Sequence, residues 1–135
     1  MILTDAGPLV ELVDQAQPLN SRCRAALEAL PSPMVTTWPA FAEAMYLLGR
    51  IGGWPLQRNL WQYVVEEVLV FYSLTTFDQL RMKALMEQYR DRPMDMADAS
   101  LVAAAEATGE KRIFTIDSDF YIYQRNGSEP FEVVP

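Results

Sequence analysis

Four acidic side chains occupy positions where charge is unusual. Asp5 directly follows the apolar run MILT, and Asp117 directly follows the run RIFTI at residues 112–116, so both stand where a strand should end. Ligands of open α/β sheets gather outside the carboxyl ends of parallel strands, and acids at such ends can therefore meet. Glu43 and Asp98 belong to stretches with the spacing of buried helices.

Carboxylates that meet at one edge of a sheet repel one another unless something positive lies between them. Mg²⁺ and Mn²⁺ satisfy this need because they prefer oxygen ligands and retain water molecules for chemistry. Two acids at strand ends and two near the starts of helices can converge on one pocket. We therefore interpret Asp5, Glu43, Asp98 and Asp117 as a candidate divalent-metal site.

Each of these acids also has a structural interpretation. Asp5 could cap the helix that follows it. Glu43 is the only charge between residues 39 and 49, and a buried charge requires a partner, so Arg50 could pair with it in place of a metal ion. The turn TIDSDF at residues 115–120 is rich in Asp and Ser, which is common in turns on structural grounds alone.

Asp98 makes the clearest case for a functional role. On a helix it shares the i, i+3, i+4, i+7 stripe with Leu101, Val102 and Ala105, and this stripe is the face toward the core. A charge in the first turn is compatible with the positive end of the helix dipole. The alternative role, capping the helix, can be filled by Asp95, and we assign it there.

The elements that must position these acids follow from periodicity and from Pro and Gly breaks. Short β-like runs alternate with longer helical ones, which is the pattern of parallel strands joined by crossover helices. A capping box is expected at Thr76 and Gln79, and residues 119–123 should form a short helix or turn. The expected strands are residues 1–4, 34–37, 69–74, 112–116 and 131–134. The expected helices are residues 8–13, 20–30, 39–53, 55–68, 77–91 and 95–109.

Composition limits the classes of protein that remain. The chain has 135 residues, half of them hydrophobic, and a net charge of −7, which argues against nonspecific adhesion to nucleic acid or to an anionic membrane. With Cys23 as its single cysteine and with no histidine, it cannot form an intrachain disulfide or use Ser-His chemistry. It lacks the basic start and apolar stretch of a signal peptide, so we expect a soluble, cytoplasmic protein.

Four segments in this order resemble the PIN-domain family, and within it the VapC-like ribonuclease toxins of toxin–antitoxin pairs. In that family four acids, one from each segment, form a metal-binding quartet. Their positions match Asp5, Glu43, Asp98 and Asp117. The four segments are MILTDAGPLV at residues 1–10, PAFAEAMYLLGR at 39–50, DMADASLVAAAE at 95–106 and IFTIDSDF at 113–120.

The resemblance implies a fold and a reaction. Residues 1–135 would form one PIN-like nuclease domain, a mostly parallel sheet between helices in three α/β/α layers. The reaction would be hydrolysis of RNA phosphodiester bonds with Mg²⁺ or Mn²⁺, with Asp5 and Asp98 as first choices for direct ligands. Thr115 matches a polar position of the family's last strand motif and is a candidate substrate contact. Asp119 could share or replace the role of Asp117 as a metal ligand.

The resemblance also implies partners. An antitoxin would cover the acidic pocket, and RNA phosphates would contact Arg50, Arg112 and Arg125, which are otherwise ordinary surface arginines. Residues 54–71 carry more apolar surface than one small layer hides, which favours a homodimer, although we expect most of the tryptophans to pack in the core. Two other functions stay open: a metal-dependent small-molecule phosphohydrolase that uses the Asp-x-Asp of TIDSDF, and a non-catalytic binding module.

Overall fold

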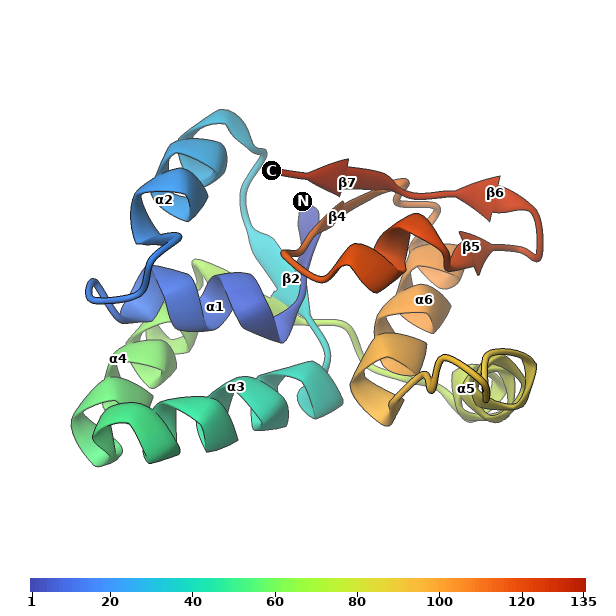
Figure 1. Ribbon diagram of the computed structural model, residues 1–135, viewed down its shortest axis with the longest axis horizontal. Helices are drawn as coiled ribbons and strands as arrows, with labels where there is room; N and C mark the ends of the chain where they lie inside the picture. Colours follow the sequence, from blue (N-terminus) through green and yellow to red (C-terminus); the bar gives the residue numbers. More distant parts are fainter.

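A parallel sheet of five short strands forms the centre of the computed structural model, which describes residues 1–135 (Figure 1). The strand order is β3-β2-β1-β4-β7, and every neighbouring pair is parallel. This arrangement confirms the fold class expected from the alternation of strand and helix patterns. The strands are β1 (Ile2–Thr4), β2 (Met34–Thr36), β3 (Leu69–Phe71), β4 (Arg112–Phe114) and β7 (Glu132–Val134).

Helices cover both faces of this sheet. In Figure 1, α1 to α4 lie to the left of the view and α5 and α6 to the right. They are α1 (Ala6–Val13), α2 (Asn20–Ala29), α3 (Trp38–Gly52), α4 (Trp54–Val65), α5 (Thr76–Gln88) and α6 (Met96–Thr108). A 3₁₀ turn, η1 (Ser118–Tyr121), and a hairpin of β5 (Gln124–Arg125) and β6 (Glu129–Pro130) complete the chain. No helix has the length and apolar character required to cross a membrane.

Side chains that alternate between the two faces of the strands divide the core into two layers. Ile2 and Phe114 belong to a cluster with residues of α1, α3 and α4, whereas Leu3 and Ile113 belong to a second cluster with residues of α5 and α6. Successive side chains of a strand point to opposite faces, so both faces of these strands are apolar and buried. Asp5 and Asp117 lie beyond the carboxyl ends of β1 and β4, so they stand at an edge of the sheet and not within a core layer.

The expected position of one capping box was wrong. The capping box of α5 is formed by Thr75 and Asp78, one position before the expected pair Thr76 and Gln79. Thr75 accepts from the Asp78 N–H at 3.1 Å, and the Asp78 carboxylate accepts from the Thr75 N–H at 2.9 Å. The β5–β6 hairpin was not expected either, because two-residue strands carry no periodic signal.

The apolar helices α3 and α4 are less buried than their composition indicated. Trp54 is 57 % exposed and Tyr46 is 61 % exposed, although we expected most of the tryptophans and the helix around Glu43 to lie in the core. Trp38 stacks on Phe71 with ring centroids 3.9 Å apart, yet its outer face remains open to solvent. Periodicity identifies apolar helix faces, but it does not say whether the chain itself covers them.

Candidate metal centre

Asp5 follows β1 and serves two purposes at once. Its extended backbone donates to the Phe114 carbonyl at 2.9 Å, which continues the pairing with β4. Its Oδ1 accepts from the Ala6 N–H at 2.7 Å and so caps α1, while its Oδ2 accepts from the Thr115 hydroxyl at 2.8 Å. The side chain is therefore both a helix cap and a fixed carboxylate at the sheet edge, and the two interpretations of Asp5 do not exclude each other.

Thr115 joins the acids of two neighbouring strands. Its hydroxyl donates to Asp5 and accepts from the Asp117 N–H at 3.0 Å. Asp117 in turn accepts from the Asp119 N–H at 2.9 Å, which starts η1. Thr115 is only 1 % exposed, so it lies behind the acids instead of presenting a free hydroxyl to a substrate.

The start of α6 supplies two more acids. Asp95 caps the helix by accepting from the Asp98 N–H at 2.8 Å, as expected. Asp98 lies in the first turn, where the helix dipole favours negative charge, and it is 7 % exposed. Its Oδ2 accepts from the hydroxyl of Tyr123 at 3.1 Å. Asp98 thus reaches the sheet edge from α6, as its position on the core stripe indicated.

Glu43 comes from the second turn of α3 and is half-buried. It forms no ion pair with an arginine. Arg50 lies two helical turns further on, and its guanidinium donates to the Tyr46 hydroxyl at 3.2 Å. The structure therefore does not support the Glu43–Arg50 pair that we considered as an alternative to a metal site.

These acids line one pocket of about 190 Å³ at the carboxyl edge of the sheet. No basic side chain is among the nine residues that line it. One carboxylate oxygen each from Asp5, Asp98 and Asp117 lies within 4.8 Å of the others. Opposite ligands of an octahedral Mg²⁺ are about 4.2 Å apart, given bonds of about 2.1 Å, so the three oxygens are close to the spacing that a hard divalent cation requires. The lining residues are Asp5, Ala6, Gly7, Glu43, Leu47, Asp95, Asp98, Ile116 and Asp117.

Burial and mutual repulsion raise the pKa values of three acids in this pocket. Burial raises the pKa of Asp5 from 3.8 to about 6, against the opposing effect of the Thr115 hydrogen bond. Burial, followed by the charges of Asp95 and Asp5, raises the pKa of Asp98 and the pKa of Glu43 to about 7. Ionising several buried carboxyl groups close together is unfavourable in free energy. A bound divalent cation would offset this effect, because it stabilises the charged form of each group.

The remaining predicted site residues lie outside the pocket. Asp119 turns toward Arg92, with 3.9 Å between Oδ1 and the guanidinium, so the structure brings Asp117 and not Asp119 to the cluster. Arg112 is at the start of β4, the end opposite to the acids, and it pairs with Glu110. Arg125 is 6 % exposed.

Arg125 is held by its own hairpin. Its guanidinium lies 3.3 Å from a Glu129 oxygen, donates to the Pro130 carbonyl at 3.1 Å and sits 5.7 Å from the centre of the Phe131 ring. Neither Arg112 nor Arg125 has a guanidinium free beside the acidic pocket. A contact between RNA and Arg50, Arg112 or Arg125 stays a prediction.

Sequence reasoning missed Asp95 as a pocket residue and Tyr123 as a partner of Asp98. Asp95 was assigned to the helix cap, and the structure adds that it also lines the pocket. Tyr123 lies 25 positions after Asp98, and no spacing rule links a residue beyond β4 to the first turn of α6. Only the tertiary structure brings these two side chains together.

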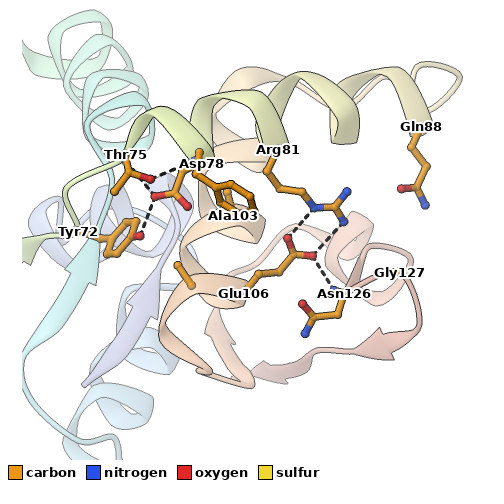
Figure 2. A pocket seen from close by; sticks show the side chains of 11 residues that line it. Tyr72, Thr75, Asp78, Arg81, Gln88, Ala103, Glu106, Asn126 and Gly127 are labelled. Atoms are coloured by element: carbon orange, nitrogen blue, oxygen red, sulfur yellow. Dashed lines mark hydrogen bonds and ion pairs between the residues drawn. The ribbon is translucent and has the colours of Figure 1, made fainter.

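A larger cavity, of about 700 Å³, lies between α5, α6 and the β5–β6 turn (Figure 2). Its polar groups bind one another: Arg81 donates twice to Glu106, at 2.7 and 3.0 Å, and Glu106 also accepts from the Asn126 N–H at 2.6 Å. The Asp78 carboxylate accepts hydrogen bonds from the Tyr72 hydroxyl and, in the capping box of α5, from the Thr75 N–H. None of the clustered acids lines this cavity, so volume alone does not identify the candidate site.

Comparison with protein families agrees with this geometry. The family model of the PIN domain matches residues 2–126. The chain belongs to the PIN domain family. No curated protein sequence matches it significantly.

Three solved structures have the same fold over most of this chain. VapC20 of Mycobacterium tuberculosis, a sarcin-ricin loop cleaving toxin, superimposes with a TM-score of 0.84 and 16 % identity over 96 % of this chain and 100 % of that one. A toxin–antitoxin complex from Klebsiella pneumoniae has a TM-score of 0.65 and 19 % identity over 89 % and 90 %. FitAcB from Neisseria gonorrhoeae has a TM-score of 0.56 and 18 % identity over 87 % and 88 %. These neighbours share the fold of this chain.

Proposed function

We propose that this protein is a Mg²⁺- or Mn²⁺-dependent endoribonuclease of the VapC type, with residues 1–135 acting as one PIN-like nuclease domain. The observation that carries the proposal is the acidic pocket. On a PIN fold, five carboxylates meet at the carboxyl edge of the sheet with no basic side chain among them. Membership of a family of nucleases and the fold shared with a toxin that cleaves the sarcin-ricin loop support RNA as the substrate.

The acids of the pocket would have different roles. Asp5, Asp98 and Asp117 would hold the ion, because their oxygens lie within 4.8 Å of one another. A bound divalent cation supplies Lewis acidity and an activated water for phosphodiester hydrolysis. Glu43 lines the same pocket from α3, is half-buried, and would orient water or a second cation.

The net charge of −7 is compatible with an RNA substrate. A divalent cation reverses the local sign of an acidic pocket, so phosphate can approach it. The eleven basic residues are distributed over the whole chain, and Arg50 is the one of our three candidates whose side chain is exposed. Salt should therefore weaken RNA binding only modestly, because few phosphates are neutralised by the protein itself.

Cleavage assays with matched variants test the proposal. The purified protein should cut structured RNA with Mg²⁺ or Mn²⁺ and stop when EDTA is added. Asp98→Asn should reduce cleavage at least about 100-fold, because it removes a ligand charge and keeps the shape of the side chain. Asp119→Asn is the control, since Asp119 follows the same turn but lies outside the cluster. EDTA-resistant cleavage, or turnover of small phosphate esters without RNA cleavage, would contradict the proposal.

We also propose that an antitoxin protein binds this chain and that two copies form a dimer. The apolar side chains exposed along α3 and α4 support both, because exposed patches of this kind mark protein interfaces. The most exposed are Trp38, Tyr46, Ile51, Trp54 and Val65. A structural neighbour was itself solved as a toxin–antitoxin complex.

Expression of the protein in cells should arrest their growth, and Asp5→Ala should relieve the arrest. Equal toxicity of the variant would count against the toxin role.

A further inference from the structure

Tyr123 contacts one acid of the cluster, Asp98, from the interior of the protein. It is completely buried, and its hydroxyl makes a single hydrogen bond, which it donates to Oδ2 of Asp98 at 3.1 Å. The aromatic ring packs edge-on against Tyr89 and Phe120, with centroids 5.0 and 5.2 Å away. Because the ring is held on two sides, the position of the hydroxyl is fixed by packing.

The carboxylate of Asp98 has fewer hydrogen-bond partners than that of Asp5. Both oxygens of Asp5 accept hydrogen bonds, from Ala6 and from Thr115, and Asp117 accepts one from Asp119. The carboxylate of Asp98 accepts only the bond from Tyr123. The last torsion of an Asp side chain is soft, so without this bond the group can rotate.

We propose that Tyr123 is a positioning residue for the metal centre. The phenol hydroxyl holds Oδ2 of Asp98 and leaves Oδ1, which accepts no hydrogen bond from the protein, available to a divalent cation. This inference rests on the proposed function, since it concerns the same pocket. It follows the general behaviour of metal sites, in which the carboxylates that bind the ion are themselves hydrogen-bonded and loss of the outer partner weakens binding.

A purely structural role is the competing explanation. A buried tyrosine needs a partner for its hydroxyl, and Asp98 could merely satisfy it. The two roles differ in their consequences. A structural hydroxyl changes the stability of the protein alone, whereas a positioning hydroxyl changes the affinity for the cation in a protein that remains folded.

The test is titration of the metal-free protein with Mn²⁺ by calorimetry, comparing wild type with Tyr123→Phe. The variant keeps the ring and loses only the hydroxyl. Tyr89→Phe is the matched control, because its ring contacts Tyr123 but its hydroxyl accepts from the Gln124 N–H and touches no acid. We expect Tyr123→Phe to weaken Mn²⁺ binding about 10-fold or more, and Tyr89→Phe to change it less than about 2-fold.

The outcomes separate the inference from the function on which it rests. Failure of the wild type to bind Mn²⁺ would refute the metal centre itself. Binding by the wild type with equal affinity in Tyr123→Phe, or equal losses in both tyrosine variants, would refute the positioning role. A crystal structure of the Mg²⁺-loaded wild type gives a check that requires no variant: Tyr123 should still bind Oδ2 while Oδ1 of Asp98 contacts the ion, and a broken hydrogen bond would overturn the inference.

Discussion

Burial favours the protonated form of three acids of the pocket by raising their pKa values. The pKa values of Asp98 and Glu43 are raised to about 7 and that of Asp5 to about 6, chiefly by burial. In an unfolded chain carboxyl groups titrate near pH 4. Between these values the folded protein therefore binds more protons than the unfolded chain, and this difference sets the sign of the pH dependence.

The free energy of unfolding of the metal-free protein should therefore fall as the pH rises from about 4 to about 7, because this contribution is complete below the unfolded pKa and is lost through the folded one. Mg²⁺ should restore stability most at the upper end, where the acids are ionised. Urea unfolding in EDTA and in Mg²⁺ at several pH values measures both effects. Asp98→Asn should make the free energy of unfolding depend less on pH. A stabilising contribution of these acids that increases with pH would contradict the account.

The hydroxyl of Thr115 ties Asp5 to Asp117, and a change to valine isolates its effect. Thr115→Val keeps the volume of the buried side chain but removes the donor to Asp5 and the acceptor for the Asp117 N–H. We expect a loss of about 1–3 kcal/mol in the free energy of unfolding. Thr108→Val, at an exposed helix end, should cost less than about 1 kcal/mol. Equal losses in the two variants would show that Thr115 has no special role.

At the scale of elements, a pair of buried hydroxyls connects the helices that carry Glu43 and Asp98. Thr37 caps α3 and Ser100 lies in α6; both are fully buried and hydrogen-bonded to each other. Ser100 donates to the Ala97 carbonyl at 2.7 Å, so Thr37 must be the donor between them. This contact fixes the relative position of two elements that each bring an acid to the pocket.

Ser100→Ala should cost about 1–3 kcal/mol of stability, because it leaves the Thr37 hydroxyl buried without an acceptor. The double variant with Thr37→Val should cost less than the sum of the single variants, since removing both partners leaves no unpaired group. Chemical denaturation of the four proteins gives the coupling free energy. Strict additivity would mean that the two hydroxyls do not stabilise the contact between α3 and α6.

The sequence predicted most elements because their signals are local. Periodicity identified all six helices, and the run MILT followed by Asp5 identified the first strand and its edge. The capping box was misplaced by one residue because Thr75 and Thr76 both have a suitable partner three positions later, and only the observed hydrogen bonds distinguish them. The contacts of Tyr123 and Ser100 could not be predicted, because they join segments far apart in the chain.

At the scale of the whole molecule, the exposed aromatic side chains of α3 and α4 require an explanation outside the monomer. If this surface forms the dimer that we propose, Trp54→Glu should convert a dimer into a monomer in light-scattering measurements. Phe77→Glu is the control, because Phe77 is 76 % exposed but lies on α5. Dissociation by both variants, or by neither, would argue against this surface as the interface.

The central claim is that the acidic pocket holds a divalent cation, and anomalous diffraction from a crystal soaked in Mn²⁺ tests it most directly. We expect a peak in the pocket about 2.2 Å from oxygens of Asp5 and Asp98, with Asp117 as a third ligand or one water away. A pocket without a peak at a Mn²⁺ concentration that supports cleavage, or a peak only at other acids of the surface, would contradict the account.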